Sequence, residues 1–399
     1  MESDVLDETI KRAKKWLIFS GIQNLDSNFL DVKGGFNSWY DIDKENYFYT
    51  YSEISGYSII TLLFLNSFEK NNLYFLRAIL SSEWLLDKAS HKSGGVKTRY
   101  YLDRENAPES YDFSSGMIHS FDNGIALSGL MELYKSTLEY RYLKTAIRIG
   151  DFLISLMQKE DGSFYASYSH RDESFKDSYD KWSTQSGSYH AKIVIGLLKL
   201  YDATKDEKYK EASLRLCNFA LGLQESNGQF ISYYGTKDTH LHPHCYSAEG
   251  LLYAGLYLNN EDYLRNAAHA TKWVLDIQMS NGGIPSMFVD NKFIGEERSD
   301  ILAQALRLGI IMLHLNLIEN RYKENLRKLA ERLISFQYRN NDTKDDGGFF
   351  YGHDIIYGNL NAEKKNHLNS WCTMFALQAL VYYRDYLNGD FNFNKDLFV

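Results

Sequence analysis

The sequence predicts an all-α fold in which six helical hairpins close into a ring, an (α/α)6 toroid with long loops on one rim. A glycine turn recurs six times at similar intervals. Each turn separates two kinds of helical segment, one amphipathic and one apolar on most of its faces. A repeat of this length is one supersecondary unit used many times, so it decides the architecture before any site is considered.

The turns share the phrase Gln-x-x-x-Gly-x-apolar. Three complete copies begin at Gln158, Gln224 and Gln278, and a stretched copy begins at Gln337. The first glycines of the six turns are Gly34, Gly94, Gly162, Gly228, Gly282 and Gly347. A chain of 399 residues would permit two or three domains, but no linker rich in Pro, Gly or Ser interrupts the units. We therefore predict a single domain over residues 1–399.

The segment before each turn has the pattern of a half-buried helix. In residues 142–157, apolar side chains recur at intervals of roughly three and four, and charged side chains occupy the other face. This is the helical period. The predicted outer helices are 5–20, 72–89, 142–157, 207–224, 261–279 and 321–338.

The segment after each turn is apolar all round, as expected of a helix inside a larger body. Small residues recur at one equivalent position, at Gly129, Gly196, Gly255 and Ala376. The predicted inner helices are 53–66, 123–134, 190–201, 249–258, 299–316 and 371–383. Six hairpins stacked side by side can bury their ends by closing into a ring. The long outer-to-inner loops then gather on one rim, where sites usually form.

Composition narrows the class of protein. The net charge is -8 and no basic stripe stands out, so a nucleic-acid partner is not expected. The three cysteines are far apart, which fits a reducing compartment. The charged N-terminus is not a secretory signal, and the longest apolar run is too short to span a bilayer. We predict a cytoplasmic protein without a membrane partner.

Short polar residues cluster at the predicted starts of the inner helices. They are Glu53, Asp122, Asn123, His190, Glu249, Asp300, Asn369 and Ser370. Ordinary N-cap and first-turn preferences explain any single acid among them, but they explain His190 poorly, because a cation is disfavoured there. The shared rim makes Asp122, Glu249, Glu53 and His190 the catalytic candidates. Glycosidic cleavage needs one carboxylic acid and one carboxylate, whereas epimerisation needs a base and an acid on opposite faces of a C–H bond.

The loops supply candidates for substrate binding. His240, His242, His244 and Cys245 form the densest ligand-like cluster, and we favour substrate contact or loop packing over a metal site there. Aromatic rings suit the C–H faces of sugars, and an arginine can receive a carboxylate bidentately. The predicted substrate-binding residues are His242, His244, Tyr100, Trp182, Tyr234, Arg99 and Asn369. The sequence indicates no cofactor and no metal.

The arrangement of segments resembles the six-hairpin (α/α)6-barrel carbohydrate enzymes, which include unsaturated glucuronyl hydrolases and N-acylglucosamine 2-epimerases. The stretch 122–151 is most similar to the glucuronyl-hydrolase pattern, in which Asp122 matches the catalytic Asp. The partner carboxylate of that family lies one repeat earlier. The nearest acid here is Glu53, where the family has Asp. The epimerase branch has a His three residues before a Glu, but Tyr246 stands at that spacing before Glu249.

The turn phrase is also similar to the repeats of terpene cyclases and protein prenyltransferases. Those repeats usually end in Trp, and the chain lacks their Asp-x-Asp-Asp motif. The favoured hypothesis is therefore hydrolysis of a glycosidic bond in an oligosaccharide. The resemblance to unsaturated glucuronyl hydrolases implies that this oligosaccharide bears a uronate. Sugar epimerisation, with His190 and His244 as proton carriers, is the alternative. A prenyl-binding toroid and a non-catalytic glycan-binding protein stay open as further alternatives.

Overall fold

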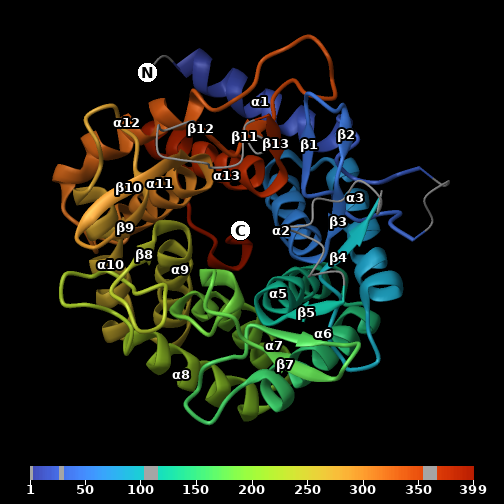
Figure 1. Cartoon of the computed structure of the whole chain (residues 1–399). Helices are drawn as coiled ribbons and strands as arrows, with labels where there is room; N and C mark the ends of the chain where they lie inside the picture. The colour runs from blue at the N-terminus through green and yellow to red at the C-terminus, as the bar shows by residue number, and fades with distance from the viewer. Residues whose placement is uncertain (1–2, 27–30, 103–115, 354–365) are drawn as a thin grey trace.

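The computed structural model describes residues 3–26, 31–102, 116–353 and 366–399. The helices form two concentric rings, and the chain runs once around them (Figure 1). Outer and inner helices alternate from the N-terminus, as the sequence predicts. The (α/α)6 toroid is confirmed.

The outer helices are amphipathic and half buried. Two of them continue into a short π-helical turn, at Leu85–Ala89 and Leu153–Met157. The outer helices are α1 (Ser3–Phe19), α3 (Asn72–Trp84), α6 (Tyr140–Phe152), α8 (Glu207–Leu221), α10 (Glu261–Asp276) and α12 (Lys323–Ile334).

The inner helices are buried over most of their length. The third of them begins as the 3-10 helix Ser188–Ile193. A Cβ at Gly129 would lie 2.7 Å from the carbonyl oxygen of Gly56, so two neighbouring inner helices approach at glycine. The inner helices are α2 (Ser52–Glu69), α5 (Ser120–Thr137), α7 (Val194–Thr204), α9 (Leu241–Leu258), α11 (Ser299–His314) and α13 (Ser370–Asn388).

The repeated glutamine fastens each turn to the next hairpin. The side-chain amide of Gln158 donates to the carbonyl oxygen of Gly162 in its own turn at 3.1 Å, and to that of Ala212 on the next outer helix at 2.9 Å. Gln224 and Gln278 make the equivalent pairs of bonds. The phrase therefore encodes the contact between successive hairpins.

The same contact closes the ring. Gln337 donates to the carbonyl oxygens of Gly347 (3.2 Å) and Thr9 (2.8 Å), and Thr9 belongs to the first outer helix α1. The first turn has its own glutamine, Gln23, which bonds Gly34 and Arg77. The sequence pattern missed Gln23, although its distance from Gly34 is similar to that of Gln337 from Gly347.

The first glycine of each turn adopts positive φ and packs against the next outer helix. We expect Gly162→Ala to destabilise the fold by about 2 kcal/mol or more. Gly162 has a φ of +88°, and a Cβ there would lie 2.5 Å from the carbonyl oxygen of Arg215. Gly235→Ala is the matched control, because Gly235 has a φ of +74° with open space around it. Denaturant unfolding should show the smaller loss for the control, and equal losses would contradict this packing role.

Short antiparallel strands occupy the long outer-to-inner connections and gather on the face seen in Figure 1. One sheet has the order β11-β13-β1-β2, and its β1–β13 pair also joins the two ends of the ring. The others have the orders β12-β10-β9-β8, β5-β6-β7 and β3-β4. The strands are β1 (Trp39–Asp41), β2 (Asn46–Tyr47), β3 (Tyr49–Tyr51), β4 (Arg99–Tyr101), β5 (Met117–His119), β6 (Ser167–Ser169), β7 (Ser174–Lys176), β8 (Thr239–His240), β9 (Pro285–Val289), β10 (Lys292–Arg298), β11 (Phe349–Phe350), β12 (Gly352–His353) and β13 (His367–Asn369).

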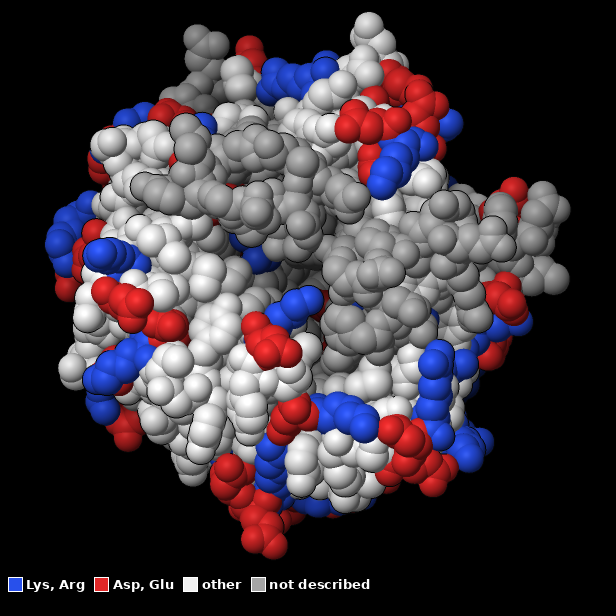
Figure 2. All heavy atoms as spheres, viewed as in Figure 1, with Lys and Arg blue, Asp and Glu red and all other residues white. Residues whose placement is uncertain are grey.

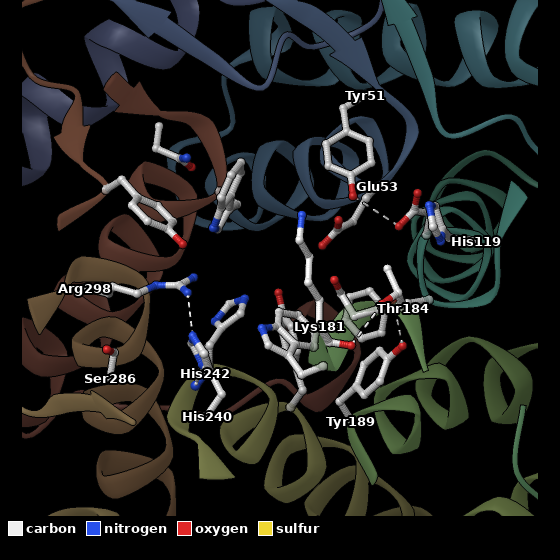
Figure 3. Close-up of a pocket in the computed structure, with 18 of the residues that line it drawn as sticks. Tyr51, Glu53, His119, Lys181, Thr184, Tyr189, His240, His242, Ser286 and Arg298 are labelled. Carbon is white, nitrogen blue, oxygen red and sulfur yellow. Dashed lines mark hydrogen bonds between the residues drawn. The ribbon is translucent and has the colours of Figure 1, made fainter. Parts of the chain in front are cut away.

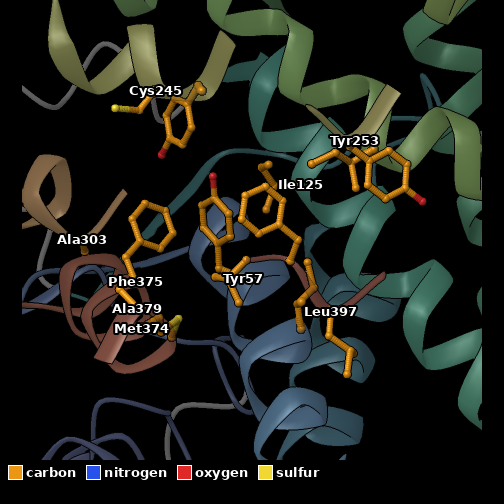
Figure 4. Close-up of a cluster of buried hydrophobic side chains, with 14 of the residues drawn as sticks. Tyr57, Ile125, Cys245, Tyr253, Ala303, Met374, Phe375, Ala379 and Leu397 are labelled. Carbon is orange, nitrogen blue, oxygen red and sulfur yellow. The ribbon is translucent and has the colours of Figure 1, made fainter. Parts of the chain in front are cut away.

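The last residues of the chain lie inside the inner ring (Figure 1). Phe398 and Val399 are buried, and Leu397 belongs to the apolar cluster drawn in Figure 4. The side chain of Gln378 on α13 donates to the carbonyl oxygen of Leu397 at 2.7 Å and accepts from the amide of Val399 at 3.1 Å. Residues 397–399 therefore pack against the inner helices. Among the described residues, no helix is long and apolar enough to cross a bilayer.

Candidate active site

A cavity of about 480 Å3 opens where the long connections meet the first turns of the inner helices. This volume lies within the range of roughly 300–1,000 Å3 that is usual for ligand pockets. Side chains from several repeats point into it (Figure 3), and the face that carries it is hollowed near its centre (Figure 2). The rim expected from the toroid is therefore a cavity lined by several hairpins.

Glu53 and Asp122 face this cavity from the first turns of the neighbouring helices α2 and α5. Burial, and then the charge of Asp122, raise the pKa of the Glu53 carboxyl to about 8. Burial likewise raises the pKa of Asp122 to about 7, against the opposing charge of Arg99. Two adjacent carboxyls in a dry site resist ionising together, so the pair shares one proton near neutral pH. The charge of Arg99 is the largest effect that lowers the pKa of Asp122, and it favours Asp122 as the ionised member.

Tyr51 and Arg99 surround this pair. The hydroxyl of Tyr51 donates to Oδ1 of Asp122 at 3.4 Å, which favours the ionised form of that carboxyl. Tyr51 on β3 pairs with Arg99 on β4, and the Arg99 guanidinium lies 4.7 Å from the ring centroid of Tyr49 and 5.1 Å from that of Tyr51. Arg99 lines the cavity beside both acids, so it supplies the nearby positive charge.

Arg298 and Asp300 form a bidentate ion pair on the wall opposite Glu53 (Figure 3). The guanidinium of Arg298 bonds both carboxylate oxygens of Asp300, at 3.1 and 2.5 Å. Trp371 donates its indole N–H to the same carboxylate at 3.1 Å. Burial would raise the pKa of Asp300, but Arg298 outweighs it and holds that pKa far below the ordinary range. Asp300 therefore orients Arg298 and is not a proton donor.

His242 is held in one tautomer by its neighbours. The Glu249 carboxylate can only accept hydrogen bonds, so Gln304 turns its Nε2 toward Glu249 at 3.4 Å. The other amide atom, Oε1 of Gln304, then faces Nδ1 of His242 at 2.7 Å. Nδ1 is consequently the donor and Nε2 the proton-accepting nitrogen. Burial lowers the pKa of His242 to about 4, so the ring is neutral at physiological pH.

Glu249 does not line the cavity, although the sequence pattern placed it at the rim. Helix α9 begins at Leu241, two turns earlier than expected, because Pro243 fits in its first turn, where no backbone N–H is needed. Glu249 therefore lies deep between helices. Its carboxylate contacts Nζ of Lys192 at 2.7 Å and a guanidinium nitrogen of Arg307 at 2.5 Å. We therefore leave Glu249 out of the catalytic set.

His190 and His244 also point away from the cavity. His190 is fully buried, its ring lies 6.1 Å from that of Phe164, and burial lowers its pKa to about 3. His244 accepts from the amide of Phe230 at 3.0 Å and pairs with the carbonyl oxygen of Ala270 at 3.1 Å. Both ring nitrogens of His244 are therefore engaged in hydrogen bonds, and neither histidine lines the cavity.

The three histidines at 240–244 do not converge on one point. His240 and His242 line the cavity, whereas His244 packs toward helix α10. The segment is the end of β8 and the first turn of α9 rather than a loop. Within the described part of the chain, no three His, Cys, Asp or Glu side chains are placed to hold a metal ion.

Two predicted aromatic contacts lie outside the cavity. Side chains alternate across a strand, so Tyr100 on β4 points away from the side of Arg99. Its hydroxyl donates to the carbonyl oxygen of Lys88, and its ring packs edge-on against Trp84. Tyr234 is exposed to solvent, while its neighbour Tyr233 lines the cavity. Trp182 and Asn369 do line it, as predicted.

Several residues of the cavity wall that the sequence analysis missed occupy the same position in the hairpin repeat. The residue immediately before each of five inner helices is its N-cap and faces the cavity. These residues are Tyr51, His119, His240, Arg298 and Asn369. Tyr, His and Arg are not preferred N-caps, so their presence there is the signal that could have found them. Two residues earlier on the same strands, Tyr49 and His367 also line the cavity.

The comparisons with known proteins agree with this architecture. The family model for Glycosyl hydrolase family 76 matches residues 109–256. The structure of cellobiose 2-epimerase from Bacillus thermoamylovorans superposes with a TM-score of 0.73 at 11% identity, covering 94% of this chain and 99% of that one. Unsaturated glucuronyl hydrolase from Bacillus sp. GL1 gives 0.67 at 15% identity, covering 95% and 96%. A comparison with curated protein sequences gave no match.

A D-mannose isomerase structure gives a TM-score of 0.71 at 13% identity, covering 94% of this chain and 97% of that one. The similar structures thus include both hydrolases and enzymes that isomerise sugars, and at these identities they show the shared fold. The predicted resemblance is confirmed: the chain has the six-hairpin (α/α)6 fold and is similar to the carbohydrate-active enzymes built on it.

Proposed function

We propose that this protein hydrolyses a glycosidic bond in an oligosaccharide, with Glu53 as the general acid and Asp122 as the carboxylate base or nucleophile. The observation that carries the proposal is the pair itself, two carboxyls with raised pKa values facing one cavity. Glycoside hydrolases work with such a pair. The partial match to a glycosyl hydrolase family supports the same chemistry.

The roles follow from the protonation states. Protonated Glu53 gives its proton to the leaving glycosidic oxygen as the bond to the anomeric carbon breaks. Ionised Asp122 takes a proton from the attacking water, or attacks the anomeric carbon itself and is later released by water. Arg99 beside the pair offers a bidentate partner for a substrate carboxylate, which favours a uronate-bearing sugar. The anomer first released, followed by proton NMR, distinguishes inversion from retention.

The proposal predicts a bell-shaped dependence of kcat/KM on pH. Activity requires Asp122 ionised, above a pKa of about 7, and Glu53 protonated, below a pKa of about 8, so the optimum should lie between these values. The charge of Arg99 lowers both pKa values, and Arg99→Gln should move both limbs to higher pH. Arg148→Gln, on the outer surface, is the charge-matched control. Limbs that stay in place in Arg99→Gln would contradict the assignment of these groups.

Sugar epimerisation is the second candidate, and the fixed tautomer of His242 favours it. A neutral imidazole whose Nε2 accepts protons can remove the proton from a carbon next to a carbonyl. His190 and His244, the proton carriers expected from the sequence, do not reach the cavity, so His242 takes their place in this candidate.

The lining of the cavity does not favour the prenyl-binding alternative. It contains carboxyl, imidazole and guanidinium groups, which do not suit an isoprenoid ligand.

One experiment separates these reactions. The purified protein is incubated in deuterated water with cello-oligosaccharides, manno-oligosaccharides and unsaturated oligouronides, and the products are followed by NMR. Hydrolysis produces new reducing ends without deuterium at C2. Epimerisation leaves the chain length unchanged and exchanges the C2 proton. Binding without turnover would instead identify a glycan-binding protein.

A further inference from the structure

Two large aromatic side chains stand in solvent beside the cavity. The exposed fraction is 64% for Tyr179 and 77% for Tyr234. Their ring centroids lie 5.5 Å apart with an interplanar angle of 36°. They come from different connections, one before the third inner helix and one before α9. Exposed apolar area is unfavourable, so a paired aromatic surface beside a binding site suggests a ligand.

The pair continues the wall of the cavity outward. Tyr233, next to Tyr234, lines the cavity, and so do Asp180, Lys181 and Trp182, which follow Tyr179. A chain-like ligand that leaves the cavity on the side of these residues would therefore pass the two rings.

Partly buried hydrogen bonds join the two connections and fix the shape of the first one. The amide N–H of Tyr234 donates to Oε1 of Gln185 at 2.7 Å, and Nε2 of Gln185 donates to the carbonyl oxygen of Lys181 at 3.0 Å. Thr184 and Ser178 close the same turn through a backbone bond of 2.6 Å. These bonds fix the backbone that carries the two tyrosines. Less conformational entropy is therefore lost when a ligand binds there.

We propose that Tyr179 and Tyr234 form an outer sugar-binding subsite that stacks on a ring of an oligosaccharide extending out of the cavity. This inference rests on the proposed function and specifies its substrate, a chain longer than the cavity alone holds. A pyranose presents an apolar C–H face to such rings, and tyrosine hydroxyls can bond its hydroxyl groups. The occupant is a sugar chain because the surface is continuous with the cavity in which the sugar is processed.

The test compares substrates of increasing length. Tyr179→Ala and Tyr234→Ala are assayed on oligosaccharides from the disaccharide to the hexasaccharide of the series that the protein processes. We expect kcat/KM to fall about five- to tenfold on the long members, mainly through KM, and to be unchanged on the shortest. The Phe variants should retain activity on long substrates, because stacking is preserved. Tyr140→Ala is the matched control, since Tyr140 is 66% exposed on the outer helix α6.

A second measurement does not depend on turnover. Retardation of the same variants in gels containing the soluble polysaccharide should weaken for both Ala variants and not for Tyr140→Ala. Loss of activity that is equal on short and long substrates, or no loss on long ones, would overturn the outer subsite while leaving the proposed function intact. If no saccharide is cleaved but retardation depends on both tyrosines, the subsite stands and hydrolysis fails.

Discussion

Replacing either cavity carboxyl with its amide is expected to lower kcat by about 100- to 10,000-fold on the processed saccharide. Asp122→Asn removes the group that accepts a proton or attacks carbon, and Glu53→Gln removes the proton for the leaving oxygen. Asp202→Asn is the control, because Asp202 is an exposed acid near the far end of helix α7. An active Asp122→Asn enzyme would contradict the proposed chemistry.

The Glu53→Gln variant should be more stable than the parent protein at alkaline pH. The pKa of Glu53 is raised on folding to about 8, so the native state binds this proton more tightly than the unfolded chain does. The associated stability is complete below the unfolded pKa and is lost as the pH rises through 8. Glu53→Gln, which cannot ionise, should therefore melt on the order of a few degrees higher at pH 9 and unchanged at pH 4. Higher stability with lost turnover separates a catalytic defect from misfolding.

The second large effect is expected at Glu249 and concerns stability. Glu249→Ala leaves the buried charges of Lys192 and Arg307 without their carboxylate, and breaking a buried pair in this way costs about 3–5 kcal/mol. Burial already lowers the pKa of Lys192 to about 8, despite the opposing charge of Glu249. Denaturant unfolding measures the loss.

A double substitution gives the control. Lys192→Met combined with Glu249→Met should cost less than the sum of the two single changes, because it leaves fewer uncompensated charges. Where the Glu249 variants remain folded, kcat should stay within about tenfold of the parent value, since the carboxylate pair of Glu53 and Asp122 is intact. Lost turnover with unchanged stability would instead restore Glu249 to the catalytic set.

The repeat was readable in the sequence because the contacts that define it are local in the chain. Gln158 and Gly162 lie in one turn, and the positive φ of the glycine and the reach of the glutamine amide fix their spacing. Helical periodicity likewise identified the twelve outer and inner segments. Glu53 and Asp122 were found for the same reason, since both lie in the first turn of a helix whose start the pattern indicated.

The tertiary structure alone decided which polar side chains share the cavity. A side chain's direction around an inner helix depends on where the helix begins, and Pro243 moved the start of α9 far enough to bury Glu249 and bring His242 to the cavity. His119 and Arg298 are unusual residues before an inner helix, but the sequence does not say that they face one cavity, which depends on how their strands and helices are placed around the ring. The sequence by itself determined six hairpins, their order and the first-turn acids, because turns and helical periods are encoded locally. The composition of the site was decided by the closure of the ring, because it joins residues hundreds of positions apart through packing that no local pattern specifies.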